Sequence, residues 1–264
     1  MTNLTYFPLC DDLIATLPPA SIVVLNPDAD YPAARIQTEE MADVARGGHP
    51  TKVHIDFGTN RQLNFWSVLN MNNTGGGPIV RSFNDSGYTT PSGDILQLGP
   101  RLLDAKGYKA TMNSRQYWEV DFSTCAPNHS FMEIGKIMAG TALRTFTCGH
   151  TSFKRTARYH NIYNDTPGGS RYAAKLEDRR NTLTFAWESS RVDPAVAEVL
   201  ELMDLTLGGA EPLIVIPDND EDEFYYVRAS DQLSNWEEKY RRSFLQGLNV
   251  TFDELARGRI QAET

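Results

Sequence analysis

Hydrophobic positions in this chain recur mostly at every second residue, in short runs that turn residues interrupt. In Val53–Phe57 the first, third and fifth residues are apolar, and Tyr117–Phe122 and Phe131–Met138 alternate in the same way. A period of two is typical of a strand with one buried face. Short strands separated by Gly, Asn and Pro turns predict a β-sandwich for the first half of the chain.

Two segments between these strands are rich in turn residues. Asn72–Pro78 contains three successive glycines and is predicted to be a loop. Gly87–Gly107 is rich in Gly and Pro and is predicted to be a long surface excursion. The sequence leaves open whether this excursion binds a partner or only covers the sandwich.

The pattern changes from about Gly140, and the strongest helix of the chain follows a strand at Arg180–Ser189. Asp193 can cap the helix and Pro194 occupies its first turn. One apolar stripe at helical spacing consists of Val196, Val199, Leu200, Met203 and Leu207. Because Gly208 and its glycine neighbour can end a helix, we predict a helix over 193–207.

Three short apolar segments after the helix, Leu213–Ile216, Phe224–Val227 and Val250–Phe252, predict a second β region. Exposed strand edges in this region would allow copies of the chain to pair. The candidates for such an oligomer interface are Phe224, Tyr225, Tyr226, Val227, Val250 and Phe252. The predicted fold is mostly β, with domains at 1–143 and 144–264.

Composition supports a folded protein and disfavours a nucleic-acid partner. The chain has 264 residues, of which 41% are hydrophobic, enough for one large domain or two modest ones. Its net charge of −9 repels phosphate, so we expect no sequence-specific nucleic-acid binding.

Cysteine usage and the N-terminus indicate synthesis in a reducing compartment. Cys10, Cys125 and Cys148 are odd in number and show no paired spacing, which disfavours a disulfide framework. We expect no signal peptide at the N-terminus, and every apolar run is too short to span a bilayer, so we expect no membrane partner.

The search for chemistry predicts no catalytic, metal or cofactor site. Cys148 and His150 could form a nucleophile and base, but no third orienting group accompanies them. The acidic run at 218–223 begins like a calcium loop, yet Glu223 stands where Gly is needed. A hydrolase that uses Glu119 and Asp121 as its acids is the weakest functional interpretation of the sequence.

Four aromatic residues have two interpretations. Trp66, Tyr88, Tyr117 and Trp118 could stack on sugar rings or contact a partner. Aromatic residues at alternating strand positions more often pack in the core or across strands.

The first half resembles the galactose-binding-domain-like jelly roll of the discoidin type. The segments that carry this resemblance are Val53–Gly58, Leu63–Asn70, Ile79–Phe83 with Asp85 and Gly87, Tyr117–Phe122 and Phe131–Ile137. The resemblance covers about residues 20–143 and implies a jelly-roll β-sandwich.

The second half resembles the tail-ring domain of phage distal tail and baseplate hub proteins. The segments that carry this resemblance are Arg180–Trp187, Asp193–Gly209, Glu211–Pro217, Phe224–Val227 and Val250–Glu254. It implies a small β-barrel with one helix that joins neighbouring subunits in a homo-oligomeric ring, a hexamer or trimer. It also implies contacts with tail tube, hub and fibre proteins.

The leading hypothesis is therefore a non-enzymatic ring component of a phage tail tip. It would be assembled in the bacterial host cytoplasm and located at the virion tail tip. The alternative is a carbohydrate-binding protein that uses the sandwich for adhesion to host glycan.

Overall fold

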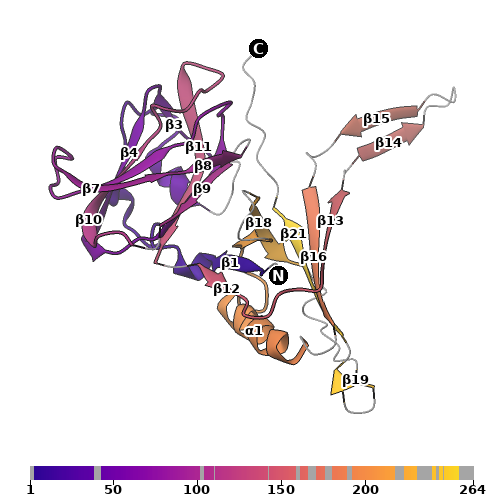
Figure 1. Cartoon of the computed structure of the whole chain (residues 1–264). Coiled ribbons are helices and arrows are strands. Elements are labelled where there is room, and N and C mark those ends of the chain that lie inside the picture. Colours follow the sequence, from indigo (N-terminus) through magenta and orange to yellow (C-terminus); the bar gives the residue numbers. More distant parts are fainter. Residues whose placement is uncertain are drawn as a thin grey trace. The chain divides into compact units, whose positions relative to one another are not determined.

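The computed structural model divides the chain into two compact units, with boundaries after Cys10 and before Leu143. It describes residues 3–38, 43–101, 104–109, 111–141, 143–158, 161–165, 171–175, 180–188, 192–217, 223–230, 240–241, 244–245 and 247–255. We call the unit from Asp11 to residue 142 the sandwich unit (Figure 1). The residues up to Cys10 and those from Leu143 to Ala256 form the sheet–helix unit.

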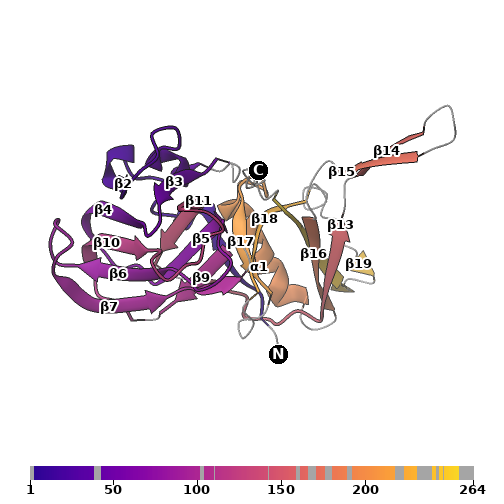
Figure 2. The ribbon, with the colours of Figure 1, turned by 90° about the horizontal axis from the view of Figure 1, so that it is seen from above.

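The sandwich unit is built from two five-stranded antiparallel sheets. The first sheet has the order β2-β4-β10-β6-β7, with strands at Ile22–Val24, Lys52–Arg61, Arg115–Asp121, Ile79–Phe83 and Pro91–Gln97. The second has the order β3-β11-β5-β9-β8, with strands at Ala45–Gly48, Phe131–Gly140, Phe65–Met71, Asp104–Tyr108 and Gly99–Arg101. Figure 2 shows β4, β10, β6 and β7 side by side in this order.

The core of the sandwich lies between the inward faces of the two sheets. Val53 and Ile55 of β4 and Trp118 of β10 meet Trp66 and Val68 of β5, and all five are fully buried. The two indole rings are 5.4 Å apart. This packing removes the largest apolar side chains from water, as expected of a sandwich core.

The mostly-β prediction is confirmed, and one predicted loop is wrong. The expected excursion at Gly87–Gly107 contains β7, β8 and β9, which lie at or next to the outer edges of the two sheets. Pro91 begins the edge strand β7, a position where a missing backbone donor costs no ladder bond. Gly and Pro therefore mark sheet edges here.

The sheet–helix unit contains a seven-stranded sheet of order β12-β1-β17-β18-β21-β16-β13. Its strands span Arg144–Thr145, Thr5–Pro8, Leu213–Ile216, Tyr225–Ala229, Gly247–Glu254, Arg180–Glu188 and Ser152–Arg158. Among the described strands, β12 and β13 end the sheet, which is therefore open where a small barrel is expected. Short hairpins are formed by β14 with β15 (Asn161–Asp165, Arg171–Lys175) and β19 with β20 (Tyr240–Arg241, Phe244–Leu245).

The first strand of the chain belongs to this sheet, although the sequence analysis places it in the sandwich domain. β1 pairs with β17, which aligns Thr5 with Ile216 and Pro8 with Leu213. Both strands are buried, and this pairing satisfies their backbone groups. A contact over about 200 residues of sequence leaves no local pattern that would predict it.

Three short 3₁₀ helices follow at Leu9–Asp11, Pro19–Ser21 and Ala33–Gln37.

The one α-helix of the described residues, α1, spans Val192–Leu205, close to the predicted 193–207. The side chains of Asp193 and Pro194, the predicted cap, lie outside the described residues. The buried stripe is Ala195, Val199 and Leu202, whereas Leu200 and Leu207 of the predicted stripe are 45% and 69% exposed. Val196 and Met203 of the predicted stripe are partly buried and pack against the same core, so the buried face is shifted only by part of a turn toward Ala195 and Leu202. Leu207 is exposed because it lies beyond the end of α1, with a φ of 49°.

The six predicted oligomer-interface residues do not form exposed edges. Phe224, Tyr225, Tyr226, Val227, Val250 and Phe252 are at most 4% exposed. Strand β18 pairs with both β17 and β21, and β21 pairs with both β18 and β16. The prediction is wrong because aromatic alternation identifies a strand but not its place within a sheet.

Candidate functional site on the sandwich

The outer face of the β2-β4-β10-β6-β7 sheet carries polar and aromatic side chains. Val53 and Ile55 of β4 are fully buried, whereas His54 and Asp56 are half-buried on the opposite face. This is the alternation of a strand whose second face is not part of the core. The face of β4 that carries His54 is therefore available for a site.

Strand register brings side chains from five strands together on this face. One row across the sheet consists of Val23, His54, Glu119, Arg81 and Ile95. The next row consists of Asp56, Tyr117 and Phe83. Neighbours in such rows lie close enough for side-chain contact.

The loop between β6 and β7 folds back over these rows and places Tyr88 on them. The Tyr88 ring stacks on His54 with centroids 3.7 Å apart and an angle of 12°. It also meets Tyr117 and Phe83 in edge contacts at 6.0 and 5.5 Å. Tyr88 adopts a φ of 55°, in the left-handed region that is unfavourable for a bulky residue. Such strain is characteristic of positions that a functional site holds in place.

Asp85 organises this loop. Its carboxylate accepts hydrogen bonds from the backbone N–H groups of Thr89 and Thr90 at 3.1 and 2.7 Å, and from the Thr89 hydroxyl at 2.9 Å. These bonds, led by that from the Thr89 backbone, lower the pKa of Asp85. The carboxylate therefore holds the turn that presents Tyr88.

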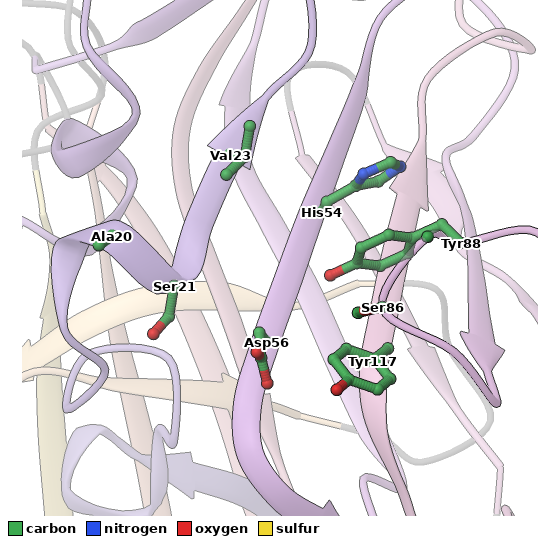
Figure 3. A pocket seen from close by; sticks show the side chains of 9 residues that line it. Ala20, Ser21, Val23, His54, Asp56, Ser86, Tyr88 and Tyr117 are labelled. Carbon is green, nitrogen blue, oxygen red and sulfur yellow. The ribbon is translucent and has the colours of Figure 1, made fainter.

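A pocket of about 370 Å³ opens between the loop, β4 and β2. Side chains that line it include Ser21, Val23, His54, Asp56, Tyr88 and Tyr117. Figure 3 shows the phenol oxygens of Tyr88 and Tyr117 on the same side as the Asp56 carboxylate. The volume lies at the lower end of the range typical of small-molecule sites, roughly 300–1,000 Å³.

The protonation of the lining groups suits hydrogen bonding to a polar ligand. Burial, with the nearby Asp56 carboxylate, raises the pKa of Tyr88, so its hydroxyl stays protonated. One oxygen of Asp56, Oδ1, accepts hydrogen bonds from the Gly58 N–H and from Gln116 Nε2, both at 2.8 Å. These two bonds orient the carboxylate, and no hydrogen bond within the described residues uses its second oxygen.

A buried ion cluster lies beside the pocket. Glu119 is 2% exposed and accepts hydrogen bonds from Lys52 at 3.1 Å, from His54 Nε2 at 3.0 Å and from Arg81 at 3.3 Å. Asp121 accepts a further bond from Arg81. The hydrogen bond to Glu119 orients the His54 ring, and Tyr88 stacks on one face of that ring.

Both carboxylates of this cluster are held in the ionised form. Burial acts to raise the pKa of Glu119, but the hydrogen bonds from His54 and Lys52 outweigh it, and the net pKa is lowered. For Asp121, burial is likewise outweighed by donors led by the Ser123 N–H. Glycoside hydrolysis needs one carboxylic acid with a raised pKa as proton donor. Neither Glu119 nor Asp121 has that property.

The structure brings together two of the four aromatic candidates. Tyr88 and Tyr117 line the pocket, whereas Trp66 and Trp118 are fully buried in the core. Adjacent residues of a strand face opposite sides, so Tyr117 points outward and Trp118 inward. His54 and Asp56 are not among the site residues predicted from the sequence, although strand alternation was the available signal for both.

Other candidate chemistry is not assembled in the described part of the chain. The three cysteines form no disulfide with one another. Within the described residues no three His, Cys, Asp or Glu side chains converge as metal ligands, and the acidic run at 218–222 lies outside them. None of the described helices has the length and apolar character that a membrane crossing requires.

Comparisons with known proteins found similar solved structures only. A fucose-binding module of Streptococcus pneumoniae is 9% identical with a TM-score of 0.38, and the match covers 50% of this chain and 95% of the module. A family 32 carbohydrate-binding module from C. perfringens NanJ, solved with galactose, is 9% identical with a TM-score of 0.38 and coverages of 53% and 99%. The lectin domain of Lectinolysin, solved with Lewis B antigen, is 10% identical with a TM-score of 0.36 and coverages of 48% and 98%.

Neither a protein-family profile nor a curated protein matches the sequence. None of the three structures named above is a phage tail protein. Identities near 10% and TM-scores below 0.5 carry no functional argument. The functional conclusion therefore depends on the geometry of the pocket.

Proposed function

We propose that the sandwich unit binds a carbohydrate in the pocket beneath the β6–β7 loop. The observation that supports this is the convergence of the Tyr88 and Tyr117 hydroxyls and the Asp56 carboxylate around one small open space. Sugars present hydroxyl groups that both donate and accept hydrogen bonds. Tyrosine hydroxyls can do either, and a carboxylate oxygen accepts. The polar groups of the pocket therefore match those of a sugar.

The pocket also offers apolar surface for the C–H groups of a sugar ring. Val23 borders the pocket and is 49% exposed, and the Tyr117 ring lines it in edge contact with Tyr88. An amphipathic lining with a few fixed polar groups is typical of small-molecule sites. This combination favours a ligand with both hydroxyls and C–H faces over a wholly apolar one.

The site is held in place before a ligand arrives. His54, Asp56 and Tyr117 lie on paired strands, and the Glu119 cluster and the Asp85 turn restrain the remaining wall. Side chains already ordered in the free protein lose little entropy on binding. We therefore expect binding without large movement of the strands.

The test is a binding measurement on two pocket variants and one control. Saturation-transfer NMR and calorimetry with a panel of methyl glycosides would compare the wild type with Tyr117→Ala and Asp56→Ala. Each variant should weaken the best ligand by about 10- to 100-fold, as expected for a lost hydrogen-bond partner. Ile95→Ser changes a 56% exposed residue on the same face outside the pocket and should bind as the wild type does. Equal affinity for all four proteins would refute the proposal.

The tail-ring role remains a separate prediction about the sheet–helix unit. Its expected interface residues lie inside the sheet, so self-association through free strand edges would have to use β12 or β13, the end strands of the described sheet. Light scattering of the purified chain measures its oligomeric state directly. A monomer at micromolar concentration would contradict the ring.

A further inference from the structure

We infer that this pocket selects neutral sugars and rejects acidic ones, with Asp56 as the residue that makes the distinction. The inference rests on the proposed function, since it names the ligand class of the same site. It depends on the charged side chains around the pocket and on the hydrogen bonds and ion pairs that they already form.

The lining residues carry one carboxylate and no lysine or arginine. Asp56 lines the pocket, and its first oxygen is held by Gly58 and Gln116, whereas no hydrogen bond of the described residues uses the second. His54 is the one basic side chain of the lining, and its Nε2 is already bonded to Glu119. An incoming carboxylate or sulfate would therefore meet a like charge at the mouth of the site.

Two cations of the same sheet, Lys52 and Arg81, are already bound to buried acids. Lys52 lies 3.1 Å from Glu119 and 3.8 Å from Asp121. Arg81 is bonded to both of the same carboxylates. Turning either cation toward a ligand would leave a buried carboxylate with fewer partners, which is unfavourable. Lys52 and Arg81 are therefore not available as partners for the carboxylate of an acidic sugar.

Recognition of a neutral sugar relies on hydroxyl groups more than on ring stacking. One face of the Tyr88 ring is covered by His54 at 3.7 Å, so a sugar cannot stack there. The Tyr88 and Tyr117 oxygens and the second Asp56 oxygen remain as hydrogen-bond partners. A site built on such partners discriminates strongly against ligands that leave them unpaired or repel them.

The experiment compares matched neutral and acidic sugars on two proteins. Calorimetry at pH 7 and low salt would measure methyl galactopyranoside against methyl galacturonate, and methyl glucopyranoside against methyl glucuronate. The neutral sugar that the wild type prefers should bind about 100-fold or more tightly than its matched acid, as a like-charge contact with a half-buried carboxylate implies. Asp56→Asn keeps the acceptor for Gly58 and Gln116 but removes the charge. It should narrow the ratio to within about 10-fold, mainly by improving binding of the acid.

Controls and outcomes separate the two claims. Asp30→Asn removes one exposed negative charge from the same unit outside the pocket and should leave the ratio unchanged. If the wild type binds the acids as tightly as the neutral sugars, or if Asp56→Asn leaves the ratio intact, the selection is refuted while sugar binding stands. If neither class binds, with the thermal transition of each protein intact, both the selection and the proposed function fail.

Discussion

Replacement of Lys136 by methionine should destabilise the sandwich unit in a manner that depends on pH. The side chains of Lys136 and Asp12 are 1% and 0% exposed, and Nζ lies 3.7 Å from Asp12 Oδ2. The other oxygen, Oδ1, accepts hydrogen bonds from the Ile14 and Ala139 N–H groups, both at 3.1 Å. Nζ also approaches two backbone carbonyls at 3.3 and 3.4 Å. Lys136 is thus the counter-charge of a fully buried carboxylate.

The pKa of Asp12 sets the pH window of the effect. Burial raises it from 3.8 to about 6, and the charge of Lys136 is the largest opposing influence. The folded protein therefore binds this proton more tightly than the unfolded chain does. The resulting stabilisation is complete below pH 3.8 and is lost as the pH rises through about 6. A shift of about 2 units corresponds to about 3 kcal/mol.

Lys136→Met removes the positive charge that stabilises the ionised form of Asp12, and it retains a similar side-chain volume in the core. At pH 8 an ionised Asp12 would remain buried without its partner, a loss of about 3–5 kcal/mol in the free energy of unfolding. At pH 5 Asp12 takes up a proton, and the loss should fall to about 1 kcal/mol, the contribution of an ordinary hydrogen bond. The difference between the two pH values is the diagnostic quantity.

The assay is hydrogen exchange of β11 peptides at increasing urea, which reports on the sandwich unit separately from the sheet–helix unit. Lys154→Met, at an exposed position of β13, is the matched control and should change stability by less than about 0.5 kcal/mol at either pH. An equal loss for Lys136→Met at pH 5 and pH 8 would refute the reasoning, because the effect would then not depend on the charge of Asp12.

Three further predictions concern packing and reactivity. Gly76→Ala should lower the free energy of unfolding by several kcal/mol, because φ is +71° and a Cβ would lie 1.9 Å from a backbone carbonyl oxygen. Gly58→Ala, with φ +68° and open space around it, should lower it by only about 1 kcal/mol. Urea unfolding of both variants measures the difference. Leu202→Ser should lower the melting temperature strongly and Leu200→Ser hardly at all, since these neighbours on α1 are 2% and 45% exposed; equal shifts would mean that the helix faces the sheet differently. Cys125, whose pKa burial raises to about 12, should resist iodoacetamide at pH 8 until urea unfolds the chain, and rapid labelling of the native protein would contradict its burial.

Local pattern was enough to locate the helix and several central strands, among them β4, β10 and β11. The alternation in Val53–Phe57 identifies β4, and the run at Leu213–Ile216 identifies β17 with the observed bounds. Local pattern failed at Gly87–Gly107, where turn residues mark edge strands, and at Leu200, where helical spacing allows two overlapping stripes. It also failed at Leu207, which lies beyond the end of α1. Periodicity specifies which residues share a face but not what covers that face.

For the candidate site, too, local pattern predicts which face a residue occupies but not which residues meet there. Alternation places His54 and Asp56 on one face of β4 and Tyr117 on the outer face of β10. Their meeting depends on the register between β4 and β10, and Tyr88 reaches them only because its loop folds back over the sheet. A local sequence pattern predicts neither the register between the two strands nor the direction of the loop.

By itself, then, the sequence determined the class of fold, the period of its strands and the acidic balance of the chain, since these follow from side-chain chemistry along short segments. Tertiary structure alone decided that β1 joins a sheet some 200 residues away, that the tyrosine-rich strand β18 is central, and that a histidine, a carboxylate and two tyrosines form one pocket. The physical reason is that strand partners are chosen by the free energy of the whole packed core, to which residues distant in sequence contribute as much as neighbours do.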